Sequence, residues 1–375
     1  MNYRRFFHNY FLEIIVPEYR QNPLTGQTVI VSAERGARPH HFDIESCEGV
    51  VEGSKLLCPF CEGNEYLTPG EVAAIRDVGT LPDAAGWRVR VIPNKFPAVC
   101  DYSELPTFNE FRKVYEFGGF PFPFGLVGRS VPAVGGHEVL IDTPRHVVSV
   151  SEMTLQETIN MFQMYQMRLD NIRSSGRWVY VQIFKNVGVA AGASIPHSHS
   201  QLIAIPFVPL SVQGILQRAA EFRERNKNCF WCNQVVCEID CGLRVVEETD
   251  SFLAICPFVS RFASEVEIYP KAHESFLESL RDADKLEEFS DLVRRTVCRL
   301  ERTVFWIKGK LAYNFVFHVE PFVHNFGSNL FHWHLSILPS LARAAGFEWG
   351  TGLHINPIPP ETAAEKLRNA TIIAR

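Results

Sequence analysis

The sequence predicts an α+β fold made of two duplicated units, each a mainly antiparallel sheet, or half-barrel, with flanking helices. Short β-branched and apolar segments follow one another with few helices between them, which favours an antiparallel sheet. The same series of motifs occurs twice along the chain, in the same order. With 375 residues, 46% of them hydrophobic, the chain is long enough to fold two such units.

The repeat has four features in each half. The first half reads CPFC, HEVLIDTPRHVVSVSEMTLQE, WVYVQIFKN and PHSHSQLIAIP, and the second reads CFWC, SEVEIYPKAHESFLESLRDAD, LAYNFVFHV and FHWHLSILP. Each half therefore has a CxxC pair, a strand with a proline turn and a histidine, a helix, a further strand, and a strand that carries HxH. Agreement of four features in order indicates an internal duplication.

The individual elements follow from local patterns in chain order. β-Branched and apolar runs predict strands at 89–94, 137–142, 178–184 and 202–207. A helix is expected after each proline turn, because apolar residues recur there at spacings of three and four: Met153, Leu155, Ile159, Met161 and Phe162 in the first half, and Phe276, Leu277, Leu280, Leu286 and Phe289 in the second. Residues 211–228 have the composition of a connecting helix. The predicted domains are 17–210 and 211–375, preceded by an extension at 1–16.

Bulk properties exclude several classes of protein. The net charge of −5 gives no general attraction to nucleic acid or to an anionic membrane. No apolar run reaches the roughly 18 residues that a transmembrane helix needs. The basic N-terminal segment lacks a small-residue cleavage site, so no signal peptide is expected and the predicted location is cytoplasmic. GxGxxG and GxxxxGK[ST] are missing, which disfavours Rossmann and P-loop nucleotide binding.

Four of the ten cysteines form two C-x-x-C pairs, Cys58–Cys61 and Cys229–Cys232, with the spacing of a metal or redox site. In a long chain of cytosolic type, C-x-x-C indicates such a site more often than a structural disulfide. The two pairs could give four thiolates to one zinc or half of the ligands to each of two zincs; the second pair could also be two buried free thiols. The repeat favours two closed, structural zinc sites, with ligands Cys58, Cys61, His146 and His197 in one and Cys229, Cys232, His273 and His332 in the other.

The segment GASIPHSHSQ places His197, His199 and Gln201 on one face of a strand, because alternate residues point the same way. If His197 binds zinc, His199 is left for chemistry. A neutral imidazole can attack an α-phosphorus and form a covalent phosphoramidate. The Gln201 amide can donate to a phosphate oxygen. The small residues Gly192, Ala193 and Ser194 allow their N–H groups to approach a phosphate closely.

These motifs resemble the galactose-1-phosphate uridylyltransferases, a branch of the histidine-triad superfamily. The resemblance runs from about Tyr19 onward and includes YRQNPLTGQTVIVSAERGARP, CPFCEGN, VIPNKFPA, IFKN and GFEWGTGLHINPIPPE. It implies that His199 is the nucleotidylated nucleophile and that the first Cys/His set holds zinc. It also implies a homodimer with the following substrate contacts: Arg35, Arg38, Asn94 and Asn186 near the nucleotide, and Phe347 and Glu348 on the sugar side, reaching across the dimer interface.

Two features depart from that pattern. The strand reads HSHSQ where uridylyltransferases have HPHGQ, and CFWC stands where their second metal site uses a glutamate and three histidines. Both features resemble the ADP-glucose phosphorylase branch, which passes AMP to inorganic phosphate. His318 and His334 could belong to a uridylyltransferase-type second site, although the cysteine pair already completes four ligands.

The predicted function is therefore a nucleotidyltransferase that moves UMP or AMP between a sugar nucleotide and a hexose-1-phosphate through His199. The alternatives are an ADP-sugar phosphorylase that uses phosphate, a zinc-stabilised nucleotide-binding protein without chemistry, and a histidine-triad hydrolase. His334 occupies the position of His199 in the second half, but Ser336 replaces the glutamine there. The second half is accordingly expected to be a catalytically silent copy.

Overall fold

The computed structural model describes residues 18–21, 28–31, 58–99, 101, 134–304, 310–323 and 329–371, the first two segments by their backbone alone. The strands are β1 (Glu18–Gln21), β2 (Thr28–Val31), β3 (Ala73–Arg76), β4 (Trp87–Pro93), β5 (Gly136–Ile141), β6 (Tyr180–Val187), β7 (His199–Ile205), β8 (Val245–Glu248), β9 (Phe252–Ile255), β10 (Val266–Pro270), β11 (Tyr313–His318), β12 (His334–Pro339) and β13 (His354–Asn356). The helices are α3 (Leu155–Ser174), α4 (Leu210–Asn226), α5 (Phe230–Cys241), α6 (Ala283–Thr303), α7 (Gly346–Thr351) and α8 (Pro360–Asn369).

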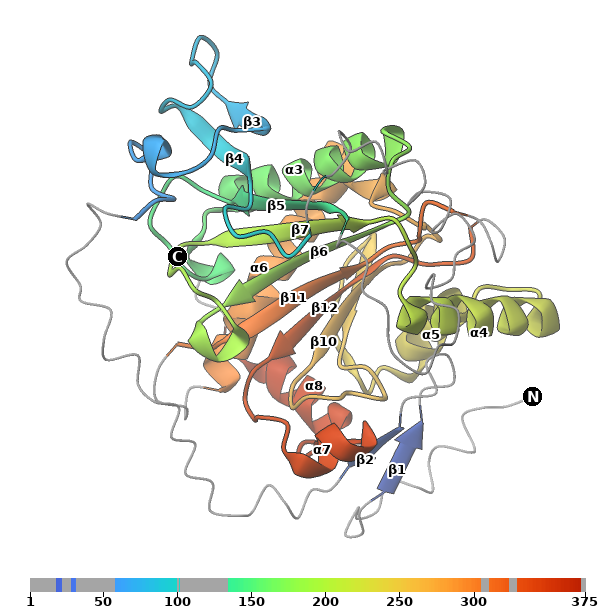
Figure 1. Ribbon diagram of the computed structural model, residues 1–375. Coiled ribbons are helices and arrows are strands. Elements are labelled where there is room, and N and C mark those ends of the chain that lie inside the picture. The colour runs from blue at the N-terminus through green and yellow to red at the C-terminus, as the bar shows by residue number, and fades with distance from the viewer. Residues whose placement is uncertain are drawn as a thin grey trace.

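One ten-stranded antiparallel sheet forms the centre of the molecule, in the order β3-β4-β5-β7-β6-β11-β12-β10-β9-β8 (Figure 1). A small separate sheet contains β1, β2 and β13, and there β13 runs parallel to β2. The α+β prediction with a mainly antiparallel sheet is confirmed, and the four strands predicted in the first half are β4, β5, β6 and β7.

The two halves of the chain enter the large sheet in the same order. Reading outward from the central pair gives β6-β7-β5-β4-β3 on one side and β11-β12-β10-β9-β8 on the other. The central pair, β6 and β11, is antiparallel, with Asn186 opposite Asn314. The duplication seen in the sequence is thus repeated in the topology, and both units share one sheet. The division into domains at 17–210 and 211–375 stays a prediction.

Helices α3 and α6 pack on the same face of this sheet and build the main core (Figure 1). The Phe162 ring of α3 lies edge-on to the Phe289 ring of α6, with 4.8 Å between centroids. Capping fixes where each helix begins: Thr154 and Glu157 form a capping box at α3, and the Asp282 side chain accepts from the Lys285 N–H at α6.

The prediction of one continuous helix across residues 276–289 was wrong. A short 3₁₀ helix, η6 (Glu278–Arg281), precedes α6, and the two are separated at Asp282. The reason is local: Asp282 is extended and caps α6, so its backbone cannot also continue the preceding turn. The apolar spacing runs across this break because residues of both segments face the same core.

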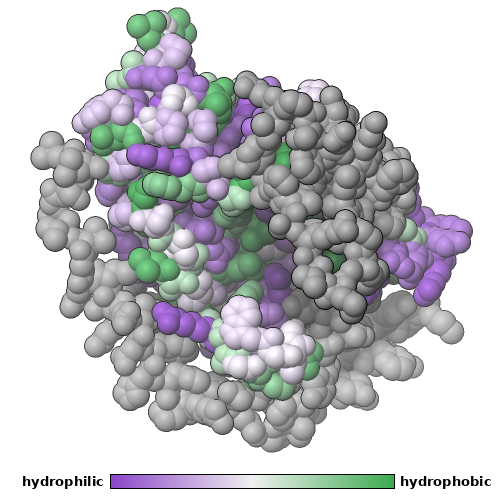
Figure 2. Space-filling view, viewed as in Figure 1, coloured by the Kyte–Doolittle hydropathy of each residue, from purple (hydrophilic) through white to green (hydrophobic). Residues whose placement is uncertain are grey.

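Helix α4 confirms the predicted connection between the halves, and it leads to α5. Figure 2 shows a hydrophilic surface where α4 projects from the body of the molecule, as expected from its run of arginine and glutamate residues. Among the described residues, no helix combines the length and apolar character needed to cross a membrane.

Candidate functional site

The HxH segment of the first half leads into β7, which begins at its second histidine, His199; β7 lies inside the sheet and pairs with β5 on one side and with β6 on the other. Alternation along the strand separates two sets of side chains. His199 and Gln201 point to one face, toward Phe60 and His137. Ser198 and Ser200 point to the other, toward Asp142. The strand therefore has two polar faces with different partners.

The first predicted metal group is brought together from four separate segments. The Cys58, Cys61, His146 and His197 ligand atoms all lie within 4.8 Å of one another. The distance from Cys61 Sγ to His146 Nδ1 is 3.3 Å, and that from Cys58 Sγ to His197 Nδ1 is 3.5 Å. Tetrahedral zinc, with Zn–S of about 2.3 Å and Zn–N of about 2.0 Å, would set sulfur and nitrogen about 3.5 Å apart. The donors fit such an ion.

The backbone fixes the orientation of the His197 ring. Its Nε2–H donates to the carbonyl oxygen of Thr143 at 2.8 Å, which leaves Nδ1 facing the two cysteines. Metal-binding histidines are commonly oriented by such an outer hydrogen bond. Burial lowers the pKa of His197 to about 4, so the ring is neutral at pH 7, as a metal ligand must be.

The second predicted metal group has the same arrangement. The Cys229, Cys232, His273 and His332 ligand atoms also lie within 4.8 Å of one another. Cys232 Sγ is 3.4 Å from His273 Nδ1 and 3.6 Å from His332 Nδ1. The His332 Nε2–H donates to the Pro270 carbonyl at 2.8 Å. Two Cys₂His₂ groups that could hold a metal ion are therefore present; the identity of the ion as zinc stays a prediction.

The His199 ring is held by the strand that carries it. Its Nδ1–H donates to the carbonyl oxygen of His197 at 2.7 Å, so the unprotonated nitrogen is Nε2. Phe60, inside the CPFC turn, packs against the ring with 5.2 Å between centroids and 61° between planes. Burial lowers the pKa of His199, and the bond to the His197 carbonyl opposes that shift. The ring is a neutral imidazole with one available lone pair.

His137, which the sequence did not single out, orients the amide of Gln201. The Ala98 N–H donates to His137 Nδ1 at 3.0 Å, so the ring proton lies on Nε2. That Nε2–H donates to Gln201 Oε1 at 2.9 Å. The Asn94 side chain lies beside the same pair, 3.0 Å from His137 Nε2. With its oxygen engaged, the Gln201 amide has its NH₂ group as the end that can donate to a ligand.

The loop between β6 and β7 contains the other predicted phosphate contacts, and it brings Gly192 near the Asn186 amide. Gly192 has φ of +87° and follows a short 3₁₀ turn, η5 (Val189–Ala191). The Gly192 and Ala193 N–H groups donate within the loop, to the Val189 and Gly188 carbonyls at 2.9 and 3.1 Å. The roles of Gly192, Ala193 and Ser194 toward a phosphate stay predictions.

Asn314, on β11, was also not found from the sequence. Its amide donates to Asn186 Oδ1 and to the Ala191 carbonyl, both at 2.8 Å. A residue of the second half therefore holds the predicted nucleotide contact of the first half. No local pattern could have shown this, because it depends on the β6–β11 register.

The remaining predicted contacts are not gathered at β7. Phe347 and Glu348 lie on α7, which Figure 1 places beside the small sheet; Phe347 is exposed, and Glu348 accepts from the Ala345 N–H at 3.0 Å. None of the described contacts joins either residue to His199, so their roles across a dimer stay predictions. Arg35, Arg38 and the extension 1–16 lie outside the described residues.

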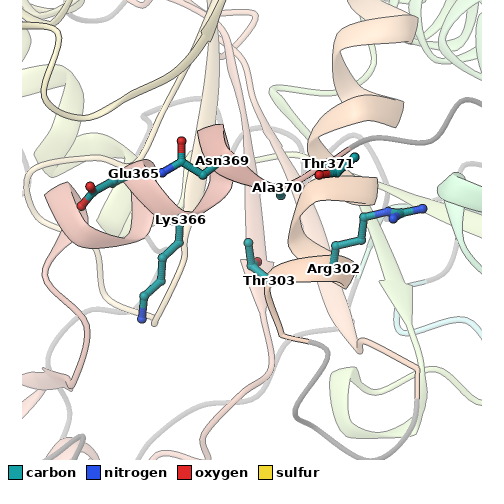
Figure 3. Close-up of a pocket in the computed structure, with 7 residues that line it drawn as sticks. All are labelled: Arg302, Thr303, Glu365, Lys366, Asn369, Ala370 and Thr371. Atoms are coloured by element: carbon teal, nitrogen blue, oxygen red, sulfur yellow. The ribbon is translucent and has the colours of Figure 1, made fainter.

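A surface pocket elsewhere carries none of this chemistry. Figure 3 shows it between the ends of α6 and α8, lined by Arg302, Thr303, Glu365, Lys366, Asn369, Ala370 and Thr371. It contains neither a cysteine nor a histidine. The functional groups lie instead along β7 and the segments that pack on it.

Known proteins resemble this chain over nearly its whole length. A family model described as galactose-1-phosphate uridyl transferase, N-terminal domain, matches residues 9–209, and a domain of unknown function (DUF4921) matches residues 134–375. The galactose-1-phosphate uridylyltransferase of Thermotoga maritima is 30% identical over 361 residues, which cover 95% of this chain and 99% of the relative. The ADP-glucose phosphorylase of Arabidopsis thaliana is 29% identical over 357 residues, 95% of this chain and 93% of the relative.

Solved structures agree with these relatives. The crystal structure of the Arabidopsis thaliana ADP-glucose phosphorylase with bound ADP-glucose has a TM-score of 0.75 at 29% identity, and the match covers 95% of this chain and 100% of the other. A uridylyltransferase structure has a TM-score of 0.66 at 26% identity, over 95% and 98% of the two chains. The chain therefore belongs to the galactose-1-phosphate uridylyltransferase family and is a nucleotidyltransferase enzyme of that type.

Proposed function

We propose that the chain transfers a nucleoside monophosphate from a nucleoside-diphosphate sugar to a phosphate-bearing acceptor, with His199 as the covalent carrier. The observation that carries this proposal is the bond from His199 Nδ1–H to the His197 carbonyl, because it leaves the Nε2 lone pair as the reactive end of a neutral ring. Relatives of the family named above support the same chemistry.

The proposed reaction has two displacements. The Nε2 lone pair of His199 attacks the α-phosphorus, the P–O bond to the β-phosphate breaks, and sugar-1-phosphate leaves with the bonding electrons. An oxygen of the acceptor phosphate then attacks the same phosphorus, and the P–N bond breaks to regenerate the imidazole. Neither step requires proton transfer to carbon or to a poor leaving group, so positioning and charge stabilisation matter most. The Gln201 NH₂ group is proposed to donate to a non-bridging oxygen.

The two Cys₂His₂ groups are proposed to hold zinc. Two thiolates and two imidazoles match the ligands of closed structural zinc sites, which leave no open position for water. Zinc in the first group would hold the strand rigid through His197. A cytoplasmic location, a homodimer, and substrate contacts from Asn94, Asn186, Phe347 and Glu348 belong to the same proposal.

The nucleotide base and the acceptor distinguish two versions of this function. In the first, UMP passes between UDP-sugar and hexose-1-phosphate, as the name of the Thermotoga relative describes for that protein. In the second, AMP passes from ADP-sugar to inorganic phosphate. The second is favoured by the HSHSQ strand, the CFWC pair and the similarity to a structure with bound ADP-glucose.

Intact mass measurement tests the proposal directly. The protein is incubated with UDP-glucose or ADP-glucose without acceptor and denatured in base, because phosphoramidates are labile in acid. An added UMP or AMP is expected in the wild type and missing in His199→Ala. Chase with galactose-1-phosphate or with inorganic phosphate then identifies the acceptor. A wild-type protein that gains no nucleotide from either sugar, or that only releases free nucleoside monophosphate, would contradict the proposal.

A further inference from the structure

A buried ion pair lies on the opposite face of β7 from the His199 ring. The side chains of Lys185 and Asp142 are 1% and 0% exposed, and their charged atoms are 2.5 Å apart. Lys185 Nζ also donates to Ser198 Oγ at 2.7 Å and to the carbonyl oxygen of His199 at 3.2 Å. All three ammonium hydrogens therefore have an acceptor, and one acceptor is the backbone of the proposed nucleophile.

The two serines of HSHSQ complete this network. Ser198 Oγ donates to Asp142 Oδ2 at 3.1 Å, and Ser200 Oγ lies 3.2 Å from Asp142 Oδ1. The Tyr165 hydroxyl of α3 in turn bonds to Ser200 Oγ. We name this set, Lys185, Asp142, Ser198, Ser200 and Tyr165, the ionic layer. It joins β5, β6, β7 and α3 beneath the HSHSQ strand.

The second half shows that the fold does not need such a layer. Ser200 lies opposite Lys185 between β7 and β6, and the corresponding pair between β12 and β11 is Leu335 and Phe317. Trp333 replaces Ser198 there, and its ring stacks on that of Phe317 with 6.4 Å between centroids. The second strand carries the same HxH and the same type of Cys₂His₂ group on an apolar support.

Burying two charges is costly, and an apolar replacement of similar volume is often neutral or stabilising. A chain that supports one HxH strand on apolar side chains gains no evident stability by supporting the other on an ion pair. The ionic layer lies behind His199, which is proposed to react, and the apolar support lies behind His334, which is expected to be catalytically silent. This points to a role in the chemistry of the first half.

We propose that Lys185 is a positioning residue for nucleotidyl transfer, which fixes the backbone of His199 through its carbonyl oxygen while Asp142 and the two serines hold the ammonium in place. The inference rests on the proposed function. It also gives the serines of HSHSQ a role: they mark the resemblance to the ADP-glucose phosphorylase branch, but they bond the ion pair and do not themselves contact the nucleotide base. A nucleophile displaced by about 1 Å can lose about 100-fold in rate, which is the size of effect at issue.

The main test copies the apolar support of the second half into the first. The double variant Lys185→Met/Asp142→Leu avoids an unpaired buried charge, and Arg168→Met/Glu138→Leu is its matched control. That control removes another ion pair, between α3 and β5, at 2.6 Å. For each protein, the single-turnover rate of His199 nucleotidylation is measured, together with metal content. The affinity for sugar nucleotide is measured in a His199→Ala background.

The Lys185/Asp142 variant is expected to keep its metal and to bind sugar nucleotide within about twofold of wild type, while its nucleotidylation rate falls about 100-fold. The control variant is expected to keep the wild-type rate. A Lys185/Asp142 variant that folds, binds metal and reacts within about threefold of wild type would overturn the inference. A wild type that never becomes nucleotidylated would instead overturn the proposed function.

A second set of variants keeps the test decisive if the double variant fails to fold. Ser198→Ala removes one bond to Lys185 and is expected to slow nucleotidylation about tenfold without changing affinity, since a charge-assisted hydrogen bond contributes about that factor. Ser198→Ala/Ser200→Gly is expected to leave the ratio of rates with UDP-glucose and ADP-glucose unchanged. An unaltered rate in Ser198→Ala, or a tenfold change of that ratio in the second variant, contradicts the inference.

Discussion

The two halves of the molecule present the same strand in two different settings. His199 and His334 each follow a Cys₂His₂ ligand by two residues, and each donates from Nδ1 to the carbonyl of that ligand, at 2.7 and 3.1 Å. Their tautomers are therefore the same. The difference lies in what surrounds each ring.

The His334 ring is stacked between aromatic neighbours. Tyr269 lies 4.9 Å from it at 26° and His318 lies 4.4 Å from it at 16°, whereas Phe60 meets the His199 ring at 61°. Burial lowers the pKa of His334 to about 3. Aromatic rings stack on the His334 ring, and Ser336 stands where the first half has Gln201. Under the proposed function, the HxH strand next to a Cys₂His₂ group would be a scaffold common to both halves, and the packing on its two faces would decide whether its second histidine reacts.

Replacing His199 or His334 with alanine is expected to give the largest difference in turnover between the two halves. His199→Ala is expected to lower turnover by at least about 10⁴-fold, because the proposed covalent route is lost. His334→Ala is expected to stay within about threefold of wild type, since its ring is proposed to be structural. Steady-state rates and intact mass check both variants. Equal losses in the two variants would contradict the division into an active and a silent half.

Removing each metal group separately tests whether the two have different consequences. Cys58→Ser/Cys61→Ser and Cys229→Ser/Cys232→Ser are each expected to lose one equivalent of zinc by elemental analysis. The first is expected to lose about 100-fold in nucleotidylation rate, because His197 supplies both a ligand and the acceptor for His199 Nδ1–H. The second is expected to lose thermal stability but to keep its rate at low temperature. A native protein with a single zinc would overturn the two-site proposal.

The pairing of His137 with Gln201 is not repeated in the second half, where Glu265 and Ser336 stand at the corresponding positions. His137→Phe is expected to lower the nucleotidylation rate about tenfold, because the half-buried Gln201 amide oxygen loses its shorter hydrogen bond, worth about 1 kcal/mol, and the longer one from Asn94 at 3.5 Å does not fix the amide by itself. The affinity for sugar nucleotide should change less. Gln217→Ala, which removes an exposed side-chain amide on α4, is the control. A His137→Phe rate equal to wild type would show that Gln201 needs no orienting partner.

Lowering the pH should weaken the stabilisation that Glu157 gives to the proline turn before His146, and should have less effect at the corresponding turn before His273. Burial alone would raise the pKa of Glu157, but hydrogen bonds from Arg145, Thr143 and the Thr154 N–H lower it from 4.5 to about 2. Because the folded-state pKa lies below the unfolded one, this stabilisation is fully present above about pH 4.5 and is lost as the pH falls toward about 2. The Tm difference between wild type and Glu157→Gln should therefore shrink from pH 6 to pH 3.

The control for this acid effect is Glu248→Gln, which removes an ion pair with Lys271 in the second half whose carboxylate is more exposed than that of Glu157, at 42% against 15%. Exposed pairs contribute little, so its Tm should differ from wild type by less than a few degrees at either pH. A Glu157→Gln difference that is constant with pH would contradict the assignment. This is the smallest of the four effects, and it compares the two turns directly.

Spacing along the sequence was enough to predict the fold class, the repeat and both Cys/His groups, because the same series of motifs occurs twice in the same order. It could not show His137, Phe60, Asn314 or the ionic layer. Those residues matter through strand register and through packing between segments far apart in the chain, as with Asp142 and Ser198, 56 residues apart. The break at Asp282 was hidden for a related reason, since residues on either side of it face one core.

The β6–β11 pair at the centre of the sheet has a consequence for any attempt to dissect the protein. Each half pairs with the edge strand of the other. Cutting the chain within α4 would therefore create two fragments, each with an exposed edge strand whose N–H and C=O groups are unpaired. Each fragment alone is expected to aggregate through this edge. The first fragment would also lose the hydrogen bond from Asn314 to Asn186. Mixed together, the fragments have the complementary edges needed for a split enzyme, in which activity reports reassembly.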